Sequence, residues 1–325
     1  MFTQTMLQRL WDNGIPEAME FPMATDMQPI QFGEIHSNVF FSSIDFIARA
    51  LNVKAFDLAV NARAVKVLVQ DGKCAGIRVM SPEKKSYDLK ANHVIVSAST
   101  LETPRLLLNS GIKGKAIGHY LKINTFVEAH GTVGRSSFPE VLGTLGILIP
   151  QTNERPYQIQ FYGPLEYFYY QASTKILQNE LFVRILGFGV IESNDENRIS
   201  LDPSRLDEFG VPRLDIRFNY SEKDKRIIRE MAAGVERAAS IMGLRLISPK
   251  QGEPPICLRE TGIDYHEQGT CRMGNDPETS ATNKYGQVHG IKGLYVADNS
   301  VIPSTGAANP TLTTGCFGHS DRRLY

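Results

Sequence analysis

Apolar and polar positions follow a strand-like pattern in the first third of the chain. Residues 64–69 and 75–79 are rich in valine, alanine and isoleucine, and such runs between turn residues are typical of strands. Asp71-Gly72 lies between them and can adopt the positive φ angles that a tight hairpin needs. Residues 87–90 continue the pattern, so we predict a three-stranded β-meander.

The segment before the meander is less regular. Residues 1–41 show little periodicity, which predicts an irregular covering segment. Ser42 and Asp45 then form a variant of a helix-capping box, and the apolar residues up to Leu51 share one helical face. We therefore expect a helix to begin after Ser42.

Two short, continuous apolar runs predict buried parallel strands at residues 94–96 and 294–297. Small residues follow the first run, and Pro104 then favours the first turn of a helix that ends at Gly111. Asn309-Pro310-Thr311 opens a terminal helix in the same way. Strand, turn and helix in this order form the unit of a parallel α/β domain.

The middle of the chain alternates with a period of two. Residues 158–162, 181–185 and 214–218 predict an antiparallel sheet with one covered and one wetter face. The string Gly187-Phe188-Gly189-Val190-Ile191-Glu192 matches only part of a dinucleotide-binding glycine motif. We interpret it as part of a strand.

A long amphipathic helix follows the alternating region. Ser221 and Asp224 cap it, and its apolar stripe ends at Gly243. We therefore expect an α/β protein that contains an α+β insert. Its expected parts are a covering segment (1–41), the first part of a nucleotide-type domain (42–118), a substrate domain with an antiparallel sheet (119–255) and the second part of the nucleotide-type domain (256–325).

Composition narrows the possible functions. The 325 residues carry 35 basic and 35 acidic side chains, whereas a surface that follows phosphates needs a basic excess, so we expect no nucleic-acid partner. The four cysteines show no C-x-x-C spacing, and no metal site is expected. No apolar run approaches the length of a membrane span, and the first residues lack the apolar segment of a secretory peptide. We expect a cytoplasmic location.

Three polar positions could carry chemistry. His266 precedes a glycine-rich turn and is either a general base or a turn histidine bonded to backbone. Asn309 is either part of a helix end that stabilises negative charge or a plain N-cap. Asp298 ends a parallel strand, where ligands collect in open α/β sheets, but it could equally cap the next turn.

These positions lie within motifs that resemble a known family. The ordered strings are H-x-x-G-T-C-R-M-G from His266, V-H-G-I-K-G-L-Y-V-A-D-N-S-V-I-P from Val288 and G-A-A-N-P-T-L-T from Gly306. Together they resemble the C-terminal signature of the glucose–methanol–choline (GMC) family of FAD-dependent oxidoreductases. Residues 62–79 and 94–107 resemble the FAD-domain segment of that family, and residues 197–212 the start of its C-terminal region.

The resemblance implies a fold, a cofactor and a reaction. The fold would be an FAD-binding Rossmann-like domain interrupted by the substrate domain, and the reaction would be oxidation of a small-molecule alcohol, sugar or polyol to a carbonyl by hydride transfer to flavin N5. His266 matches the catalytic base, and Asn309 the second catalytic position. The matching cofactor-binding positions are Val65 at the adenine end, Ala98, and Asp298, Asn299, Pro310 and Thr311 along the flavin. The electron acceptor is not specified.

The sequence also departs from the family pattern. It contains no G-x-G-x-x-G turn, so we expect an incomplete FAD-binding domain in a truncated chain that alone binds FAD poorly and is inactive. Ser99-Thr100 stand where the family usually has Gly-Ala. The alternative function is a non-catalytic fragment or subunit that acts only with another chain, and a nucleotide-binding module without redox chemistry is the third.

Overall fold

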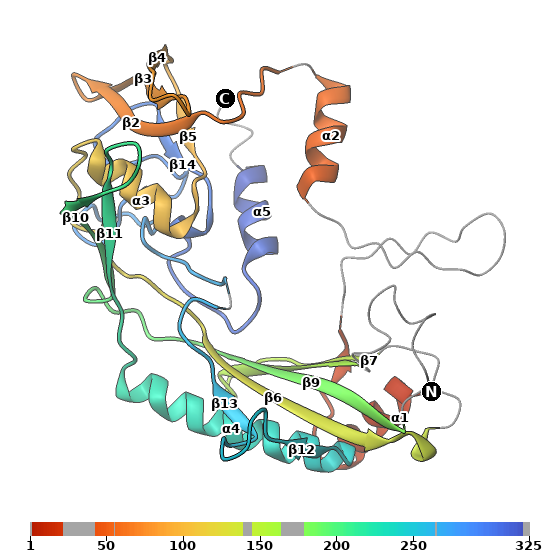
Figure 1. Cartoon of the computed structure of the whole chain (residues 1–325). Coiled ribbons are helices and arrows are strands. Elements are labelled where there is room, and N and C mark those ends of the chain that lie inside the picture. Colours follow the sequence, from red (N-terminus) through yellow and green to blue (C-terminus); the bar gives the residue numbers. More distant parts are fainter. Residues whose placement is uncertain are drawn as a thin grey trace.

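The computed structural model describes residues 2–21, 43–54, 56–138, 145–163, 179–263 and 265–320. Within these residues the chain forms two lobes (Figure 1). The lower lobe is an antiparallel sheet covered by helices α1 (Phe2–Asp12) and α4 (Glu222–Met242). The upper lobe is built from short parallel strands, a β-meander and helix α3 (Ser99–Asn109). The expected α/β architecture with an antiparallel insert is confirmed.

The sheet of the lower lobe contains seven strands among the described residues. Its order is β1-β7-β8-β9-β6-β12, and β13 also pairs with β6. The strands are β1 (Met19–Glu20), β6 (Thr125–Gly134), β7 (Leu145–Ile149), β8 (Tyr157–Gly163), β9 (Glu180–Gly189), β12 (Arg245–Ile247) and β13 (Ile256–Leu258). The glycine string that resembles part of a nucleotide motif thus ends strand β9, as predicted.

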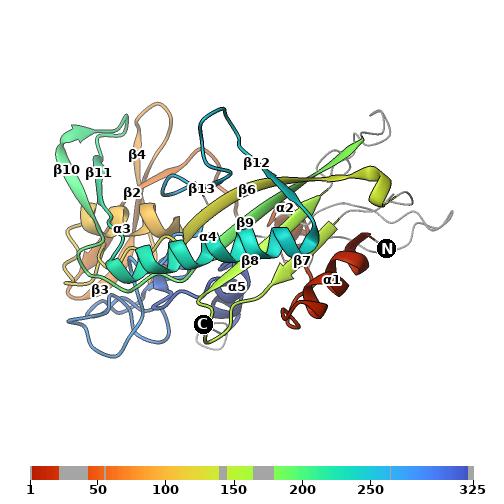
Figure 2. The same cartoon turned by 90° about the horizontal axis from the view of Figure 1, so that it is seen from below.

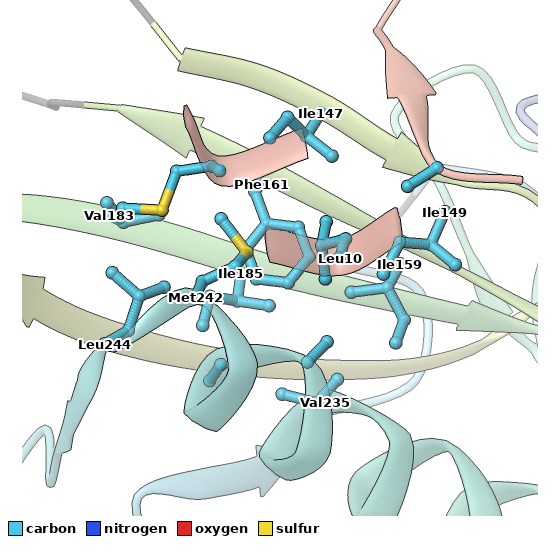
Figure 3. Packing of buried hydrophobic residues seen from close by; sticks show 14 of the residues in the cluster. Leu10, Ile147, Ile149, Ile159, Phe161, Val183, Ile185, Val235, Met242 and Leu244 are labelled. Carbon is cyan, nitrogen blue, oxygen red and sulfur yellow. The ribbon is translucent and has the colours of Figure 1, made fainter. Parts of the chain in front are cut away.

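One face of this sheet forms the largest hydrophobic core (Figure 3). Side chains alternate across a strand, so Val183, Ile185 and Phe161 all point toward α4, where they meet Val235. Seen from below, α4 runs along the sheet with α1 beside it (Figure 2). The opposite face of the sheet looks toward the upper lobe and is left for the candidate site.

Helix α4 has the ends that its sequence predicts. The Ser221 side chain accepts from the backbone amide of Asp224, and the Asp224 carboxylate accepts from that of Ser221, which completes the capping box. Gly243 ends the helix in the left-handed conformation, with φ 76°.

The irregular segment expected over residues 1–41 begins instead with a helix, α1. Phe2, Met6 and Leu10 recur every four residues and are buried against the sheet and α4. The sequence has few capping signals there, and tertiary packing supplies most of the stability of such a helix. Residues 22–42, including the capping residue Ser42, lie outside the described residues, and helix α2 (Ser43–Val53) follows them.

The upper lobe contains the predicted parallel pair. Strands β5 (Val94–Val96) and β14 (Leu294–Val296) pair in parallel although about 200 residues separate them. The predicted meander is also present as β2 (Arg63–Gln70), β3 (Lys73–Met80) and β4 (Ser86–Lys90). Asp71 and Gly72 have φ angles of 51° and 71°, as a tight hairpin turn requires. Helix α5 (Thr311–Ser320) stands beside this lobe.

The expected start of helix α3 at Pro104 is wrong, because the helix begins at Ser99 and Pro104 lies inside it. Proline has no N–H, so the carbonyl of Thr100 loses its helical donor. The Thr270 hydroxyl donates to that carbonyl at 2.5 Å and replaces the missing bond. The partner comes from a segment 170 residues away, which local sequence cannot reveal.

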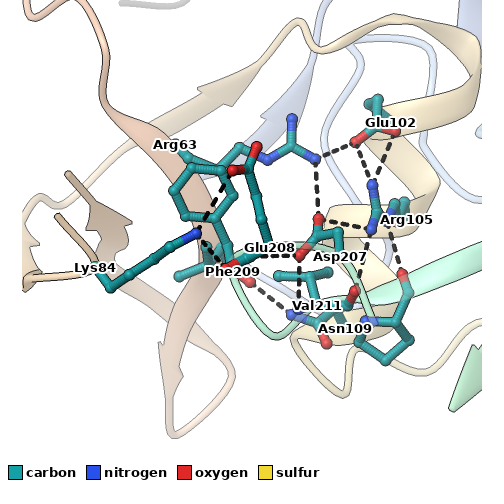
Figure 4. A network of polar contacts seen from close by, with 11 residues as sticks. Arg63, Lys84, Glu102, Arg105, Asn109, Asp207, Glu208, Phe209 and Val211 are labelled. Atoms are coloured by element: carbon teal, nitrogen blue, oxygen red, sulfur yellow. Dashed lines mark hydrogen bonds and ion pairs between the residues drawn. The ribbon is translucent and has the colours of Figure 1, made fainter. Parts of the chain in front are cut away.

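The third alternating run is not part of the large sheet, contrary to expectation. Residues Pro212–Arg217 form β11, which pairs only with β10 (Arg198–Leu206) within the described chain. This hairpin is fixed to α3 by the buried Arg105, whose guanidinium contacts Glu102 and, at 2.8 Å, Asp207 (Figure 4). Alternation predicts a strand but does not identify its partner.

Ser99 has a φ angle of 83°, a left-handed conformation that is costly for any residue with a Cβ atom. We expect Ser99→Gly to raise the free energy of unfolding by about 0.5–1 kcal/mol, because relief of roughly 1–2 kcal/mol exceeds the extra freedom of glycine in the unfolded chain. Urea denaturation measures the change. Ser240→Gly, inside the regular helix α4, is the control and should destabilise the protein. Two equal effects would contradict the prediction.

No helix in the described parts of the chain combines the length and apolar character needed to cross a membrane.

Candidate active site

The side chains of His266 and Asn309 meet between the two lobes. Asn309 Nδ2 lies 3.0 Å from His266 Nε2, although the residues are 43 positions apart and belong to different loops. His266 precedes a short backbone bridge formed by Gln268, and Asn309 immediately precedes Pro310 and helix α5. The structure thus brings together the two residues that the sequence nominates for catalysis.

A chain of hydrogen bonds orients the Asn309 amide. The hydroxyl of Tyr162 donates to Gln160 Oε1 at 2.5 Å, and Gln160 Nε2 donates to Asn309 Oδ1 at 3.2 Å. Because Asn309 Oδ1 is the acceptor there, its Nδ2 group faces His266. Both Gln160 and Tyr162 belong to β8, so the large sheet determines the orientation of a side chain on the other lobe.

His266 lies in a largely apolar environment. Its ring centroid is 5.0 Å from that of Phe188, and Phe188 stacks on Phe126 at 4.8 Å. Burial lowers the pKa of His266 to about 4. The imidazole is therefore neutral at physiological pH, and its Nε2 lone pair accepts the hydrogen bond from Asn309. A neutral imidazole of this kind can take a proton.

Lys122 joins the two loops that carry these residues. Its backbone exchanges two 2.9 Å hydrogen bonds with Gln268, and its ammonium group donates to the carbonyl of Pro303. The side chain is only 1% exposed. Burial, with a smaller contribution from the positive charge of Arg272, lowers the pKa of Lys122 to about 8. Lys122 holds the loop before Asn309 against the loop after His266.

The carboxylate of Asp298 connects two elements of the upper lobe. It accepts from the Ser99 amide at 3.0 Å, the Thr103 hydroxyl at 2.5 Å and the Ser300 amide at 2.8 Å. It therefore ties the end of β14 to the start of α3. The neighbouring Asn299 accepts a hydrogen bond from Thr314 and so fixes the first turns of α5.

Val65 and Ala98 line one pocket of about 210 Å³ in the upper lobe. The carbonyl of Val65 accepts from Asn109 Nδ2 at 2.7 Å, so the backbone of β2 is fixed there. Two of the predicted cofactor-binding residues, Val65 at the adenine end and Ala98, therefore line the same pocket. Ala98 precedes Ser99, whose amide donates to Asp298, so this pocket adjoins the end of β14.

The described residues fit the two ends of FAD but not its pyrophosphate. Pro310 and Thr311 open helix α5, and the first amides of a helix have no partner within it, which suits the electron-rich end of a flavin. The pocket at Val65 suits a nucleoside. The glycine turn that normally receives the pyrophosphate is missing from the sequence. The donor set therefore fits FAD at its two ends, without a pyrophosphate site.

No cluster of three metal-binding side chains occurs among the described residues. The free thiol of Cys271 is fully buried, and burial raises its pKa. Neither feature adds a metal or a nucleophile to the site.

Sequence reasoning missed the supporting residues Gln160, Tyr162, Phe188 and Lys122. The first three lie on predicted strands, but the face they occupy depends on a register that alternation alone does not fix. Lys122 carries no sequence signal, since lysine is almost always a surface residue.

Comparison with known proteins agrees with the motifs. Two family models described as GMC oxidoreductase match the chain, the N-terminal model over residues 42–126 and the C-terminal model over residues 193–318. A C-glycoside 3-oxidase from Arthrobacter globiformis is 32% identical over 275 residues, covering 79% of this chain and 51% of the relative. A 2-methyl-1,2-propanediol dehydrogenase from Mycolicibacterium austroafricanum is 26% identical over 308 residues, covering 80% and 52%.

The fold is similar to that of pyridoxine 4-oxidase from Mesorbium loti, with a TM-score of 0.66 at 14% identity. That match covers all of this chain and 69% of the other. The chain spans about half the length of the curated relatives it matches. The family models, which together cover more than half of its residues, and the ordered site motifs lead to one conclusion: this chain belongs to the GMC oxidoreductase family.

Proposed function

We propose that the chain forms the base-bearing and substrate-facing part of an FAD-dependent oxidoreductase that converts a CH–OH group to a carbonyl. The observation that carries this proposal is the 3.0 Å contact between Asn309 Nδ2 and His266 Nε2. It places one hydrogen-bond donor and one neutral base where a single alcohol oxygen can use both.

The site residues divide the proton chemistry between them. When the alcohol binds, the Asn309 amide turns from His266 Nε2 to donate to the alcohol oxygen, and the freed Nε2 lone pair accepts the hydroxyl proton as the C–O bond becomes a carbonyl. FAD, when bound, supplies the acceptor for the hydride that leaves the same carbon. Phe188 and Phe126 keep His266 away from water and thus neutral.

We propose a sugar or polyol as the substrate. Support comes from the names of two relatives, one an oxidase of a C-glycoside and the other a dehydrogenase of a diol. The polar side chains of Gln160 and Tyr162 also occupy the sheet face beside Asn309, where hydroxyl groups can find partners.

We further propose that tight FAD binding needs additional polypeptide. Parallel sheets are normally covered on both faces, yet Ile95 in β5 is 51% exposed and Leu312 in α5 is 80% exposed. These exposed apolar side chains favour a packing partner. The same observation supports the alternative, a non-catalytic subunit that acts only in association with another chain.

Flavin binding tests the proposal. The purified chain mixed with FAD should not yield stoichiometric flavoprotein by absorbance. The same chain, preceded by the residues of the Arthrobacter relative that lie upstream of its match, should bind flavin and be reduced anaerobically by glycosides. Stoichiometric FAD on the isolated chain would contradict the incomplete site. Flavin binding without reduction by any alcohol would favour the non-catalytic alternative.

The pH dependence of flavin reduction should reflect the low pKa of His266. We expect the rate to stay flat down to about pH 5 and to fall only as the pH approaches about 4, where the imidazole becomes protonated. The folded pKa lies below the unfolded value, so the contribution of His266 to stability should also decrease between pH 6.5 and about 4. Stopped-flow reduction across this range measures the first effect. Half-loss of rate near pH 6.5 would contradict the assignment.

Removing the amide that orients Asn309 should slow the reaction without unfolding the protein. We expect Gln160→Leu to lower the rate of flavin reduction about 10-fold or more, because Asn309 can then rotate away from His266. Gln158→Leu is the matched control, since Gln158 lies two residues away on the same face and its Nε2 has no hydrogen-bond partner among the described residues. Equal losses in both variants would assign the effect to sheet packing.

A further inference from the structure

One carboxylate and two guanidinium groups form a compact cluster on the sheet. Glu128 Oε1 lies 2.6 Å from Arg184 Nε, and Glu128 Oε2 lies 3.1 Å from Arg259 Nη1. The Glu128 side chain is 9% exposed, whereas each arginine side chain is 41% exposed. The buried carboxylate therefore anchors two cations that remain accessible at the surface of the sheet.

The cluster lies on the same sheet face as the candidate active site. Phe126 pairs with Phe188, which contacts His266, and side chains alternate along a strand. Glu128 is two positions from Phe126, and Arg184 is four positions from Phe188, so both share the face of Phe188. The intervening residues of β6 and β9 point to the opposite face and pack against α4.

The cluster also adjoins the hydrogen-bond chain that orients Asn309. Arg184 pairs in register with Tyr162, the first donor of that chain. At about 3.3 Å per residue, Arg184 lies roughly 13 Å along β9 from Phe188. A strand spacing of this size is comparable with the length of an aryl glycoside or a disaccharide.

The charges of the cluster do not cancel. Each oxygen of Glu128 contacts one guanidinium, so the three groups carry one excess positive charge. His130, 3.7 Å from Glu128 Oε1, adds a further positive charge whenever its imidazole is protonated. A guanidinium has five N–H donors, and Glu128 engages one nitrogen of each arginine. The guanidinium donors that Glu128 does not engage can donate charge-assisted hydrogen bonds to an incoming carboxylate.

We propose that Arg184 and Arg259 form a subsite for a carboxylate group of the substrate, with Glu128 as the residue that positions them. This subsite rests on the proposed function and narrows its substrate class. The preferred substrate would be an acidic glycoside whose reacting hydroxyl lies at His266 and whose carboxylate lies at the far end of the molecule.

Binding of a matched pair of probes tests the subsite. The probes are 4-carboxyphenyl β-glucoside and its neutral analogue 4-carbamoylphenyl β-glucoside, titrated calorimetrically into the FAD-loaded fusion of this chain with the upstream residues of the Arthrobacter relative. We expect the carboxylate to bind at least 10-fold more tightly, and the preference to shrink as sodium chloride rises from 50 to 500 mM. Arg184→Gln and Arg259→Gln should each reduce the preference to about threefold or less.

Arg245→Gln is the control, because Arg245 lies on the same sheet but pairs with Glu180, at 2.8 Å, and not with Glu128. It should leave the preference unchanged. Equal binding of the two probes by the wild-type protein, or an unchanged preference in both arginine variants, would overturn the proposal. If the variants fail to fold, the salt dependence of the wild-type preference decides alone, and a preference that salt does not alter would overturn it.

Failure of the subsite and of the proposed function give different results. If both glucosides reduce the flavin with equal affinity, the oxidoreductase proposal stands and the subsite is wrong. If the carboxylate binds selectively but neither glucoside reduces the flavin, the subsite stands and the oxidation proposal is wrong for glycosides.

Discussion

Replacing His266 by glutamine should lower the rate of flavin reduction by about 10²–10⁴-fold in the FAD-loaded fusion with the upstream Arthrobacter residues, the usual contribution of a positioned general base. Glutamine retains the size and hydrogen-bonding ability of the side chain but cannot accept a proton at physiological pH. The contact with Asn309 can therefore persist while the proton acceptor is lost. Anaerobic stopped-flow absorbance with a saturating alcohol measures the rate.

The matched control is His289→Gln. His289 Nε2 contacts the Ser280 hydroxyl at 2.9 Å in the upper lobe and takes no part in the site. Flavin content and the unfolding midpoint, measured in both variants, separate loss of chemistry from loss of structure. Undiminished reduction in His266→Gln would show that another group accepts the proton.

Phe161→Ala should cost about 3–5 kcal/mol of unfolding free energy. The ring of Phe161 is fully buried between β8 and the helices of the lower lobe, and its removal leaves a cavity that neighbours fill only in part (Figure 3). Because domains are stable by about 5–15 kcal/mol, the variant should unfold at a markedly lower temperature or accumulate poorly. Thermal unfolding followed by circular dichroism measures the shift.

Leu312→Ala provides the comparison for this effect. Leu312 is 80% exposed in the isolated chain, so its truncation should change stability by less than about 0.5 kcal/mol. A loss below about 1 kcal/mol in Phe161→Ala would mean that the lower lobe is not packed as described.

Much of the fold could be predicted from local patterns, and the errors have a common cause. The meander, the parallel pair β5–β14 and the capped helix α4 all depend on short-range turn and cap chemistry or on continuous apolar runs. Pro104 inside α3 and the separate β10–β11 hairpin depend on partners distant in sequence, Thr270 for the first and Arg105 for the second. Local periodicity contains no information about such partners.

The candidate site also combines residues that local motifs identify with residues that they do not. His266 and Asn309 could be nominated because they belong to ordered motifs, and the structure places them in contact. Gln160 and Lys122 act only through register and burial, which single-sequence patterns do not determine. Asp298 lies at the end of a parallel strand, as expected. Its three hydrogen bonds connect the end of β14 to the start of α3.

The replacement of a helical bond by Thr270 has a consequence for how the chain opens. The Thr100 carbonyl accepts from the Thr270 hydroxyl, and the Thr100 hydroxyl donates to the Glu267 carbonyl at 2.7 Å. Hydrogen bonds in both directions therefore connect α3 to the loop after His266. Neither segment can fray without exposing the unsatisfied groups of the other. In hydrogen-exchange experiments the amides of α3 and of residues 267–273 should therefore gain and lose protection as a single cooperative unit.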